Sequence, residues 1–266
     1  MTTLPITSMF IPGSRRSLRL VERNLYVYRH TWTVIVSGFF EPLFYLFSIG
    51  FGLGALIGTV PGPNGEPIPY QAFVAPALLA TAAMNGAVME STFNFFFKLN
   101  YNKTFAAILT TPLSPGDIAT GELLWALVRG GLYTIGFVVV MVLLGLVVSP
   151  WALLAFPAAL LVGFAFAAVG MAATSFMKTW QDFDLIQLVI LPMFLFSATF
   201  YPIETYPPAL QLIVRITPLY QGVDLIRSLT LGAISPVLLL HVAYLAVMGI
   251  VGMSIVSRRL DQLLLR

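Results

Sequence analysis

Long apolar runs alternate with short polar segments along almost the whole chain. Each run is close to the ~20 residues that an α-helix needs to cross the hydrocarbon core of a bilayer. The pattern therefore predicts an all-α, polytopic membrane protein with six transmembrane helices. We expect these spans at about residues 33–58, 71–97, 118–147, 151–177, 183–200 and 236–257.

The segments that join the predicted spans are short or rich in helix breakers. Residues 59–70 (TVPGPNGEPIPY) are dense in Pro and Gly and predict a loop, and Ser149-Pro150 predicts a tight turn. The segment 201–235 carries too many charges to cross a membrane, yet it is too apolar for a free loop. We expect it to form a re-entrant helical hairpin, a pair of short helices that dip into the outer face.

A basic amphipathic helix is predicted ahead of the first span. Apolar residues from Leu18 to Trp32 recur at spacings of three and four, while Arg15, Arg19 and Arg23 form a second stripe at spacing four. A helix of this kind suits the headgroup layer, so we expect an N-terminal interfacial helix. The first 13 residues lack the basic start of a signal peptide, so we expect the first span to be retained.

Composition agrees with a membrane location. The 266 residues are 58% hydrophobic and only 9% charged, against the roughly 25% charged residues of an ordinary soluble domain. Together with a mean hydropathy of +0.90, this excludes a single soluble domain. The absence of cysteine excludes a disulfide scaffold, a thiolate metal site and a cysteine nucleophile.

The placement of Lys and Arg sets the predicted orientation, because these residues are enriched in cytoplasmic segments. Eleven of them flank the spans on the side of both termini, and two lie on the opposite side. We therefore expect residues 1–32 to form a cytoplasmic N-terminus, 33–257 the six-helix domain and 258–266 a cytoplasmic tail. The eleven are Arg15, Arg16, Arg19, Arg23, Arg29, Lys98, Lys103, Lys178, Arg258, Arg259 and Arg266.

Groups that could carry catalysis are sparse. The two histidines, His30 and His241, lie at opposite ends of the sequence, and no HExxH, GxSxG or GxxxxGK[ST] pattern occurs. An ion-coupled carrier would show broken helices in two repeated halves. Glu41-Pro42 and Pro192 interrupt two spans, but we find no repeat. The residues favour a transport or scaffold subunit without a metal or cofactor, with a membrane-embedded lipid-modifying enzyme as the alternative.

Three charged residues, Glu41, Glu90 and Arg129, lie well inside the predicted spans, away from their ends. At 1.5 Å per residue, Glu41, Glu90 and Arg129 all lie about 10–16 Å from the cytoplasmic side. Isolated charges are expensive at that depth. We therefore expect Arg129 to pair with Glu41 or Glu90 as a structural lock, with the other glutamate protonated or facing a wet cavity. Direct contact with cargo is the alternative role of this cluster.

Two stretches resemble a known family. Residues 101–125 (YNKTFAAILTTPLSPGDIATGELLW) look like the cytoplasmic loop of type-2 ABC exporter permeases. The branch they most resemble includes the nodulation lipo-oligosaccharide and daunorubicin exporters. Residues 196–232 resemble a second signature of these permeases, with Ala198 where the family most often has glycine. The Glu41–Gly54 run also looks like the family's first span.

The resemblance implies the membrane subunit of an ATP-driven exporter in the bacterial plasma (inner) membrane. It implies two permease copies, identical or similar, and separate ATP-binding subunits that hold ATP and Mg. The implied cargo is an amphipathic, drug-like or lipid-linked glycan molecule, and nucleic acid is not an expected partner. The candidate groove or gate for this cargo is aromatic. Its candidate residues are Phe40, Tyr45, Phe194, Phe196, Phe200 and Tyr201.

The resemblance also places a coupling helix within the cytoplasmic segment 98–117. Asn100 or Asn102 can cap such a helix, and the apolar side chains of Phe105 and Ile108 suit a groove on the ATPase. The alternative is a simple interfacial helix. The candidate coupling residues are Tyr101, Asn102, Lys103, Thr104, Phe105, Ile108 and Leu109.

Overall fold

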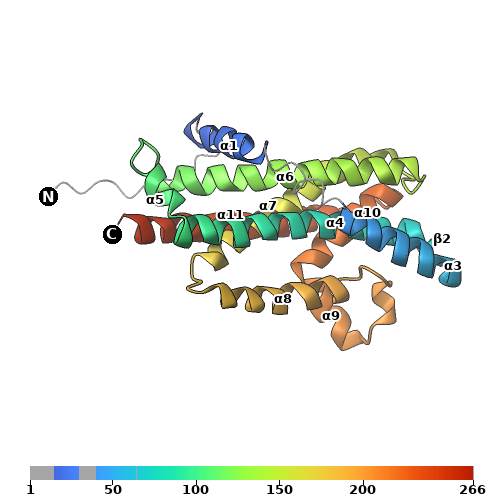
Figure 1. The fold of residues 1–266 in the computed structure, drawn as a ribbon. Helices are drawn as coiled ribbons and strands as arrows, with labels where there is room; N and C mark the ends of the chain where they lie inside the picture. The colour runs from blue at the N-terminus through green and yellow to red at the C-terminus, as the bar shows by residue number, and fades with distance from the viewer. Residues whose placement is uncertain (1–14, 30–39, 64, 266) are drawn as a thin grey trace.

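The computed structural model describes residues 15–29, 40–63 and 65–265. Its long helices run side by side, and α1 lies across the outside of α6 near one end (Figure 1). The elements are α1 (Arg15–Tyr28), η1 (Leu46–Leu53), α3 (Gly54–Ile57), β1 (Thr59–Pro61), β2 (Pro67–Pro69), α4 (Tyr70–Met89), η2 (Glu90–Asn94), η3 (Phe97–Tyr101), α5 (Thr104–Ile108), α6 (Pro115–Leu143), η4 (Pro150–Leu154), α7 (Ala155–Thr174), η5 (Trp180–Asp182), α8 (Phe183–Phe196), η6 (Ile203–Thr205), α9 (Pro208–Ile216), α10 (Pro218–Leu231) and α11 (Val237–Leu264).

Five helices in the described part of the chain are long and apolar enough to cross a membrane. They correspond to five of the six predicted spans, although the expected start of the first span lies outside the described residues. Their bounds are Phe40–Ile57, Tyr70–Tyr101, Pro115–Leu143, Pro150–Thr174 and Val237–Leu264.

The sixth expected span, 183–200, ends early. Helix α8 has 14 residues, which is about 21 Å and shorter than the ~30 Å hydrocarbon core. The helix stops at Phe196, and two residues later Ala198 takes a positive φ of 54° that no helix can accommodate. A sixth crossing therefore stays a prediction.

The core forms around α4, which packs against α6, α7 and α10 and is buried along nearly its whole length. Helices α7 and α11 approach closely because α11 carries glycine at the contact. A Cβ added at Gly249 would lie 2.1 Å from the Phe164 ring, and one added at Gly252 would lie 2.7 Å from the backbone of Ala168. Small residues at helix contacts are typical of membrane bundles, where close van der Waals packing drives association.

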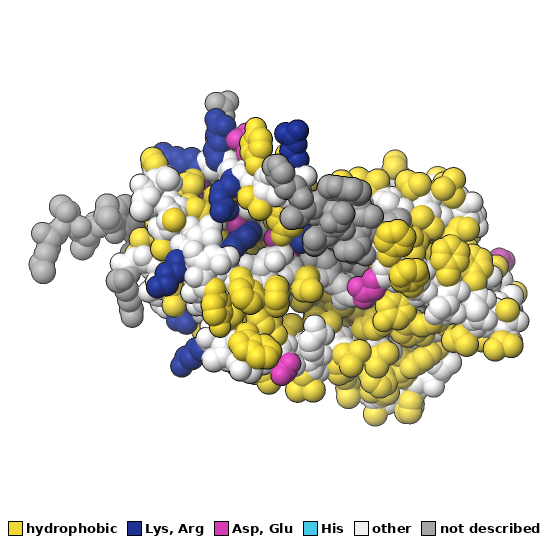
Figure 2. All heavy atoms as spheres, viewed as in Figure 1, with side chains coloured by type: hydrophobic (Ala, Val, Ile, Leu, Met, Phe, Trp, Pro, Cys, Tyr) yellow, Lys and Arg dark blue, Asp and Glu magenta, His cyan; other side chains and the backbone are white. Residues whose placement is uncertain are grey.

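The two ends of the bundle differ in charge. Helix α5 and the C-terminal end of α11 lie at one end, and α3, β2 and α10 lie toward the other (Figure 1). Lys and Arg side chains gather at the α5 end, and apolar side chains dominate the rest of the visible face (Figure 2). The expected loop 59–70 is instead a short antiparallel hairpin in which Thr59 pairs with Pro69.

The segment around α5 corrects two local expectations. No asparagine caps α5, because η3 continues through Tyr101 and the chain turns at Lys103, which has a positive φ of 48°. The helix α6 begins three residues earlier than expected. Ser114 and Asp117 bond reciprocally at its start, with Pro115 in the first turn, which is a capping box.

The segment 201–235 does form two short helices, α9 and α10, of nine and 14 residues. Arg227 fixes α10 to the core. Its guanidinium donates to the carbonyl oxygens of Phe73, at 3.1 Å, and Ala198, at 2.7 Å, and lies 3.8 Å above the Phe73 ring. His241 of α11 is buried against Asp224 of α10, with 3.0 Å between Nε2 and Oδ2. That these two helices form a re-entrant hairpin stays a prediction.

Candidate functional site

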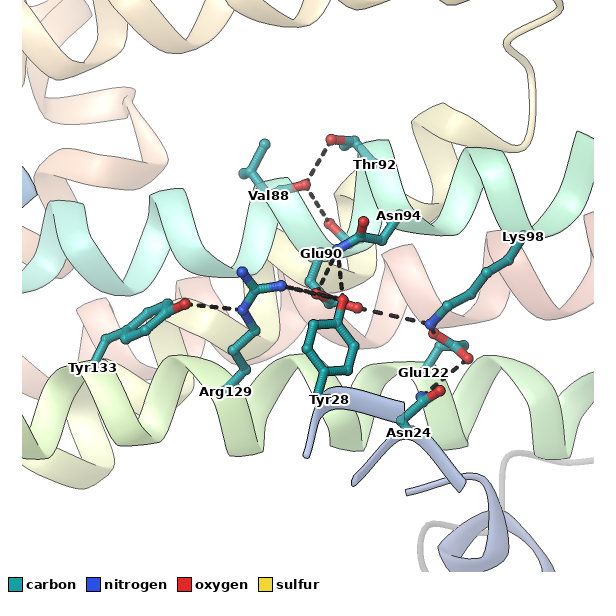
Figure 3. Close-up of polar contacts among 11 residues, drawn as sticks. Asn24, Tyr28, Val88, Glu90, Thr92, Asn94, Lys98, Glu122, Arg129 and Tyr133 are labelled. Atoms are coloured by element: carbon teal, nitrogen blue, oxygen red, sulfur yellow. Dashed lines mark hydrogen bonds and ion pairs between the residues drawn. The ribbon is translucent and has the colours of Figure 1, made fainter. Parts of the chain in front are cut away.

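Four charged side chains form an alternating chain inside the bundle (Figure 3). Arg129 Nη1 donates to Glu90 Oε2 at 2.5 Å. The other oxygen of Glu90 lies 3.8 Å from Lys98 Nζ, which in turn donates to Glu122 Oε2 at 2.6 Å. Two positive and two negative charges therefore lie next to opposite partners, and this charge network is neutral as a whole.

The charge network is buried. The side chains of Glu90 and Glu122 are 1% and 3% exposed, and those of Arg129 and Lys98 are 9% and 15% exposed. Burying isolated charges would cost several kcal/mol each. Because the signs alternate, each buried charge has an opposite partner that offsets part of this cost. Arg129 gains a further partner on its own helix, because its Nε donates to Tyr133 Oη at 3.0 Å.

The helix α1 is hydrogen-bonded to this network. Tyr28 Oη lies 3.5 Å from Glu90 Oε2 and accepts a bond from Asn94 Nδ2 at 3.1 Å. The Tyr28 ring packs at a tilt against Trp125, with 5.0 Å between the ring centroids. Asn24 Nδ2 donates to Glu122 Oε1 at 3.3 Å. Burial, and then the negative charge of Glu90, raise the pKa of Tyr28 to about 12. The phenol therefore stays protonated at neutral pH.

The geometry of α4 and its continuation brings the acidic and basic groups together. Glu90, Asn94 and Lys98 follow one another at spacing four, and Glu90 opens the π-helical segment η2. π-Helical turns are frequent at functional sites. Of the two pairings that the sequence left open, the structure has Arg129 with Glu90, and Glu41 makes no ion pair within the described residues.

A cavity of about 530 Å³ opens beside the charge network. Its walls come from the start of the Phe40–Ile57 helix, from α4 with η2, from α6 and from α8. Polar groups come from Glu41, Asn85, Gln187, Arg129, Thr81 and Thr92, and most of the other lining side chains are apolar or aromatic. Glu41 is exposed to this space and accepts a bond from Asn85 Nδ2 at 3.4 Å.

The candidate groove residues divide between two places. Tyr45 and Phe194 line the cavity with their rings 5.4 Å apart, and Phe40 lines a second hollow beside it with Glu41 and Tyr45. Phe200 does not line the cavity but packs on Phe194 at 5.2 Å. The rings of Phe196 and Tyr201 contact Tyr206 near the α9 segment.

The candidate coupling residues also divide, and here the expectation about the apolar face is wrong. Phe105 and Ile108 are buried within the chain, and the Phe105 ring packs 5.0 Å from Phe95. They cannot fill a groove on a partner while they pack there. Thr104 and Leu109 are half-buried. The exposed side of this segment is formed by Tyr101, Asn102, Lys103, Ala106, Ala107 and Thr110.

Sequence reasoning missed two members of the charge network, Lys98 and Glu122, and the tyrosine that bonds to the network, Tyr28. Lys98 was assigned to a solvent-facing cytoplasmic segment, Glu122 to a family motif, and Tyr28 to an apolar stripe. A signal was present in the spacing. Lys98 lies eight residues after Glu90, and Arg129 lies seven after Glu122, so each pair lies on one helix face.

The bundle of long apolar helices, with a partly polar cavity between them, indicates a multi-pass membrane protein of the transport class. The chain belongs to the ABC-2 type transporter family, whose sequence profile matches residues 17–231. It is 34% identical over 231 residues to Nodulation protein J of Rhizobium leguminosarum bv. viciae, covering 85% of this chain and 87% of that protein. It is 36% identical over 200 residues to Nodulation protein J of Rhizobium meliloti (strain 1021), covering 75% and 74% respectively.

These matches confirm the resemblance drawn from the cytoplasmic loop and the second signature. The chain is thus a transport component and not an enzyme. Among the described residues, no group of three or more His, Asp or Glu side chains is placed to hold a metal ion.

Proposed function

We propose that this chain is the permease subunit of an ATP-driven exporter that moves an amphipathic molecule out of the cytoplasm or the inner leaflet. The observation that carries the proposal is the cavity beside Arg129. It combines polar groups, from Glu41, Asn85 and Gln187, with aromatic and aliphatic walls. Such a mixture suits cargo with one polar and one apolar part.

The ATP-binding subunit is proposed to dock on the exposed side of the α5 segment. This surface contains Tyr101, Lys103 and Ala106 and lies at the end where Lys and Arg gather (Figure 2). It is also connected to the cavity. Lys98, three residues before Tyr101, belongs to the charge network that ends at Arg129 on the cavity wall. Movement of the docked α5 segment can therefore be transmitted through the charge network to the cavity wall.

The proposed setting is the bacterial inner membrane, with both termini in the cytoplasm and two permease copies in each exporter. Helix α1 lies in the headgroup layer, α8 with the residues that follow it makes the sixth crossing, and α9 with α10 forms the re-entrant hairpin. The absence of native cysteine makes the hairpin testable. Single cysteines at Thr205 and Ala233 should both react with an impermeant thiol reagent added outside. Reaction of only one contradicts the hairpin.

The proposal is tested by co-expressing the chain with candidate Walker-motif ATPases of the ABC class, beginning with any that is encoded beside its reading frame. We expect a stoichiometric complex, and proteoliposomes of that complex should export a fluorescent amphiphile only when ATP is hydrolysed. An ATPase carrying a Walker-lysine substitution is the control. A complex that forms but never transports would favour an assembly scaffold, and failure to associate with any ATPase would contradict the proposal.

A further inference from the structure

Glu41 is the one cavity carboxylate without a cationic partner in the described part of the chain. Its one hydrogen bond within the described residues is a long one from the neutral amide of Asn85, at 3.4 Å. None of the ion pairs within the described residues includes Glu41. Its side chain is exposed and lines the cavity. Glu41 belongs to a helix apolar enough to cross a membrane, where a lone charge is expensive unless water or a ligand meets it.

Arg129 does not neutralise Glu41. Among the described residues that line the cavity, only these two carry a formal charge. The positive charge of Arg129 is already matched by Glu90 at 2.5 Å, and the charge network behind it is neutral. Glu41 is therefore the one acidic group of the cavity that no cation among the described residues matches.

The surroundings of Glu41 suit an organic cation. Tyr45 and Phe194 form an edge-to-face pair in the same cavity, and Phe40 and Phe44 join Glu41 in the adjoining hollow of about 440 Å³. The faces of aromatic rings attract ammonium and guanidinium groups, and more strongly where water is excluded. A carboxylate beside such rings selects a cation that also carries apolar substituents.

Arg129 offers a second recognition element. Its Nε and Nη1 are engaged by Tyr133 and Glu90. Its Nη2 has no hydrogen-bond partner among the described residues and points away from Glu90 (Figure 3). Since Arg129 lines the cavity, this nitrogen can donate to a carbonyl, ether or hydroxyl oxygen of a bound molecule.

We propose that the cavity selects amphiphiles that carry an ammonium or amidinium group, with the Glu41 carboxylate as counter-ion and Arg129 Nη2 as donor to a neighbouring oxygen. This inference rests on the proposed function and deepens it by naming the charge of the cargo. Cargo of this class satisfies the charge of Glu41 and fills the aromatic part of the cavity at once.

The test uses three fluorescent probes with the same apolar body and different heads: trimethylammonium, its uncharged tert-butyl counterpart, and sulfonate. Binding is measured to the full chain in phosphatidylcholine nanodiscs, with partition into empty discs subtracted. We expect the cationic probe to bind about tenfold or more tightly than the neutral one, as an ion pair of about 1.4 kcal/mol or more requires. Glu41→Gln should remove this preference and leave the Kd of the neutral probe within about twofold.

Glu66 is an exposed carboxylate in the β1–β2 connection. Glu66→Gln is therefore the matched control and should keep the preference for the cationic probe. Retained binding of the neutral probe shows that Glu41→Gln is folded. Equal affinities for cation and neutral probe, a preference for sulfonate, or an unchanged preference in Glu41→Gln would each overturn the inference. If the complex with its ATPase still exports the neutral probe, the proposed function survives that failure; if no probe is bound or exported, both fail.

Discussion

Arg129 of α6 donates to Glu90 of η2 at 2.5 Å while it also lines the cavity, so one guanidinium belongs to a buried ion pair and to the wall of the candidate cargo site. This double position links the two roles that the sequence left as alternatives. The pair holds α6 against the continuation of α4, and Nη2 remains free to meet cargo. Stability and transport should therefore respond differently to different substitutions here.

Arg129→Ala should sharply lower the amount of assembled protein. It leaves Glu90 buried without its closest positive partner, and breaking a buried pair costs about 3–5 kcal/mol. Replacing both members by apolar residues, Arg129→Met with Glu90→Leu, should recover much of the loss because no lone charge remains. The measurement is the monodisperse fraction of a fluorescent fusion in size-exclusion chromatography. Normal assembly of Arg129→Ala with lost transport would refute the lock and leave the cargo role.

Tyr28 should make stability depend on alkaline pH. Its folded-state pKa is raised to about 12 by burial and by Glu90, whereas an exposed tyrosine ionises near pH 10. The contribution is fully present below pH ~10 and is lost as pH rises from about 10 to 12, because only the unfolded state then releases the proton. Thermal unfolding across this range should show the loss, and Tyr28→Phe should reduce it. Tyr26→Phe, at a position that is 71% exposed, should not.

Ala198→Gly should stabilise the chain. Ala198 has a φ of 54°, in the left-handed region that costs a residue with a Cβ roughly 1–2 kcal/mol. Glycine removes that cost, and the carbonyl oxygen that accepts from Arg227 Nη2 is unchanged. A rise in Tm of about 2–4 °C is expected. Ala243→Gly, inside helix α11, should have the opposite effect because glycine weakens a helix interior.

The α5 segment should tolerate charge on one side only. Ala106→Glu, on the exposed side, should leave the permease assembled but lower the yield of ATPase that co-purifies with it. Phe105→Glu should instead destabilise the permease itself, because this side chain is fully buried against Phe95. Comparing Tm with subunit stoichiometry separates the two effects. Equal ATPase yield for Ala106→Glu and the parent would place the docking surface elsewhere.

Hydropathy was sufficient for five helices but not for the end of α8. Apolar runs specify where a helix is stable in lipid. The turn at Ala198 depends on a left-handed backbone conformation, which an alanine in the sequence does not predict. The resemblance to the permease signature, with Ala198 where glycine is expected, was the one available hint. The hairpin β1–β2 was missed for a similar reason, since Pro and Gly mark a turn without specifying pairing across it.

The site was partly predictable. The expected depths along the spans predicted that Arg129 pairs with a glutamate, because an unpaired charge within the hydrocarbon core is costly. Periodicity also grouped Phe105 with Ile108 correctly, but it could not decide whether their face packs inward or onto a partner. The pairing of Lys98 with Glu122 was not predicted, because Lys98 lies near a predicted helix end, where a lysine can equally well face water.

In the proposed function, the cavity between the first span, α4, α6 and α8 carries the cargo. Filling this cavity and measuring ATP-driven export, in proteoliposomes that contain the ATPase, tests that role. Gln187 of α8 lines the cavity and is exposed, so Gln187→Trp adds bulk without replacing a buried side chain. Val189→Trp, on the same helix but outside the cavity, is the control. We predict that Gln187→Trp assembles normally and loses at least about 90% of the export rate, roughly the tenfold effect of 1.4 kcal/mol. Val189→Trp should export at the parent rate. Parent-like export by Gln187→Trp would contradict the proposal that cargo passes through this cavity.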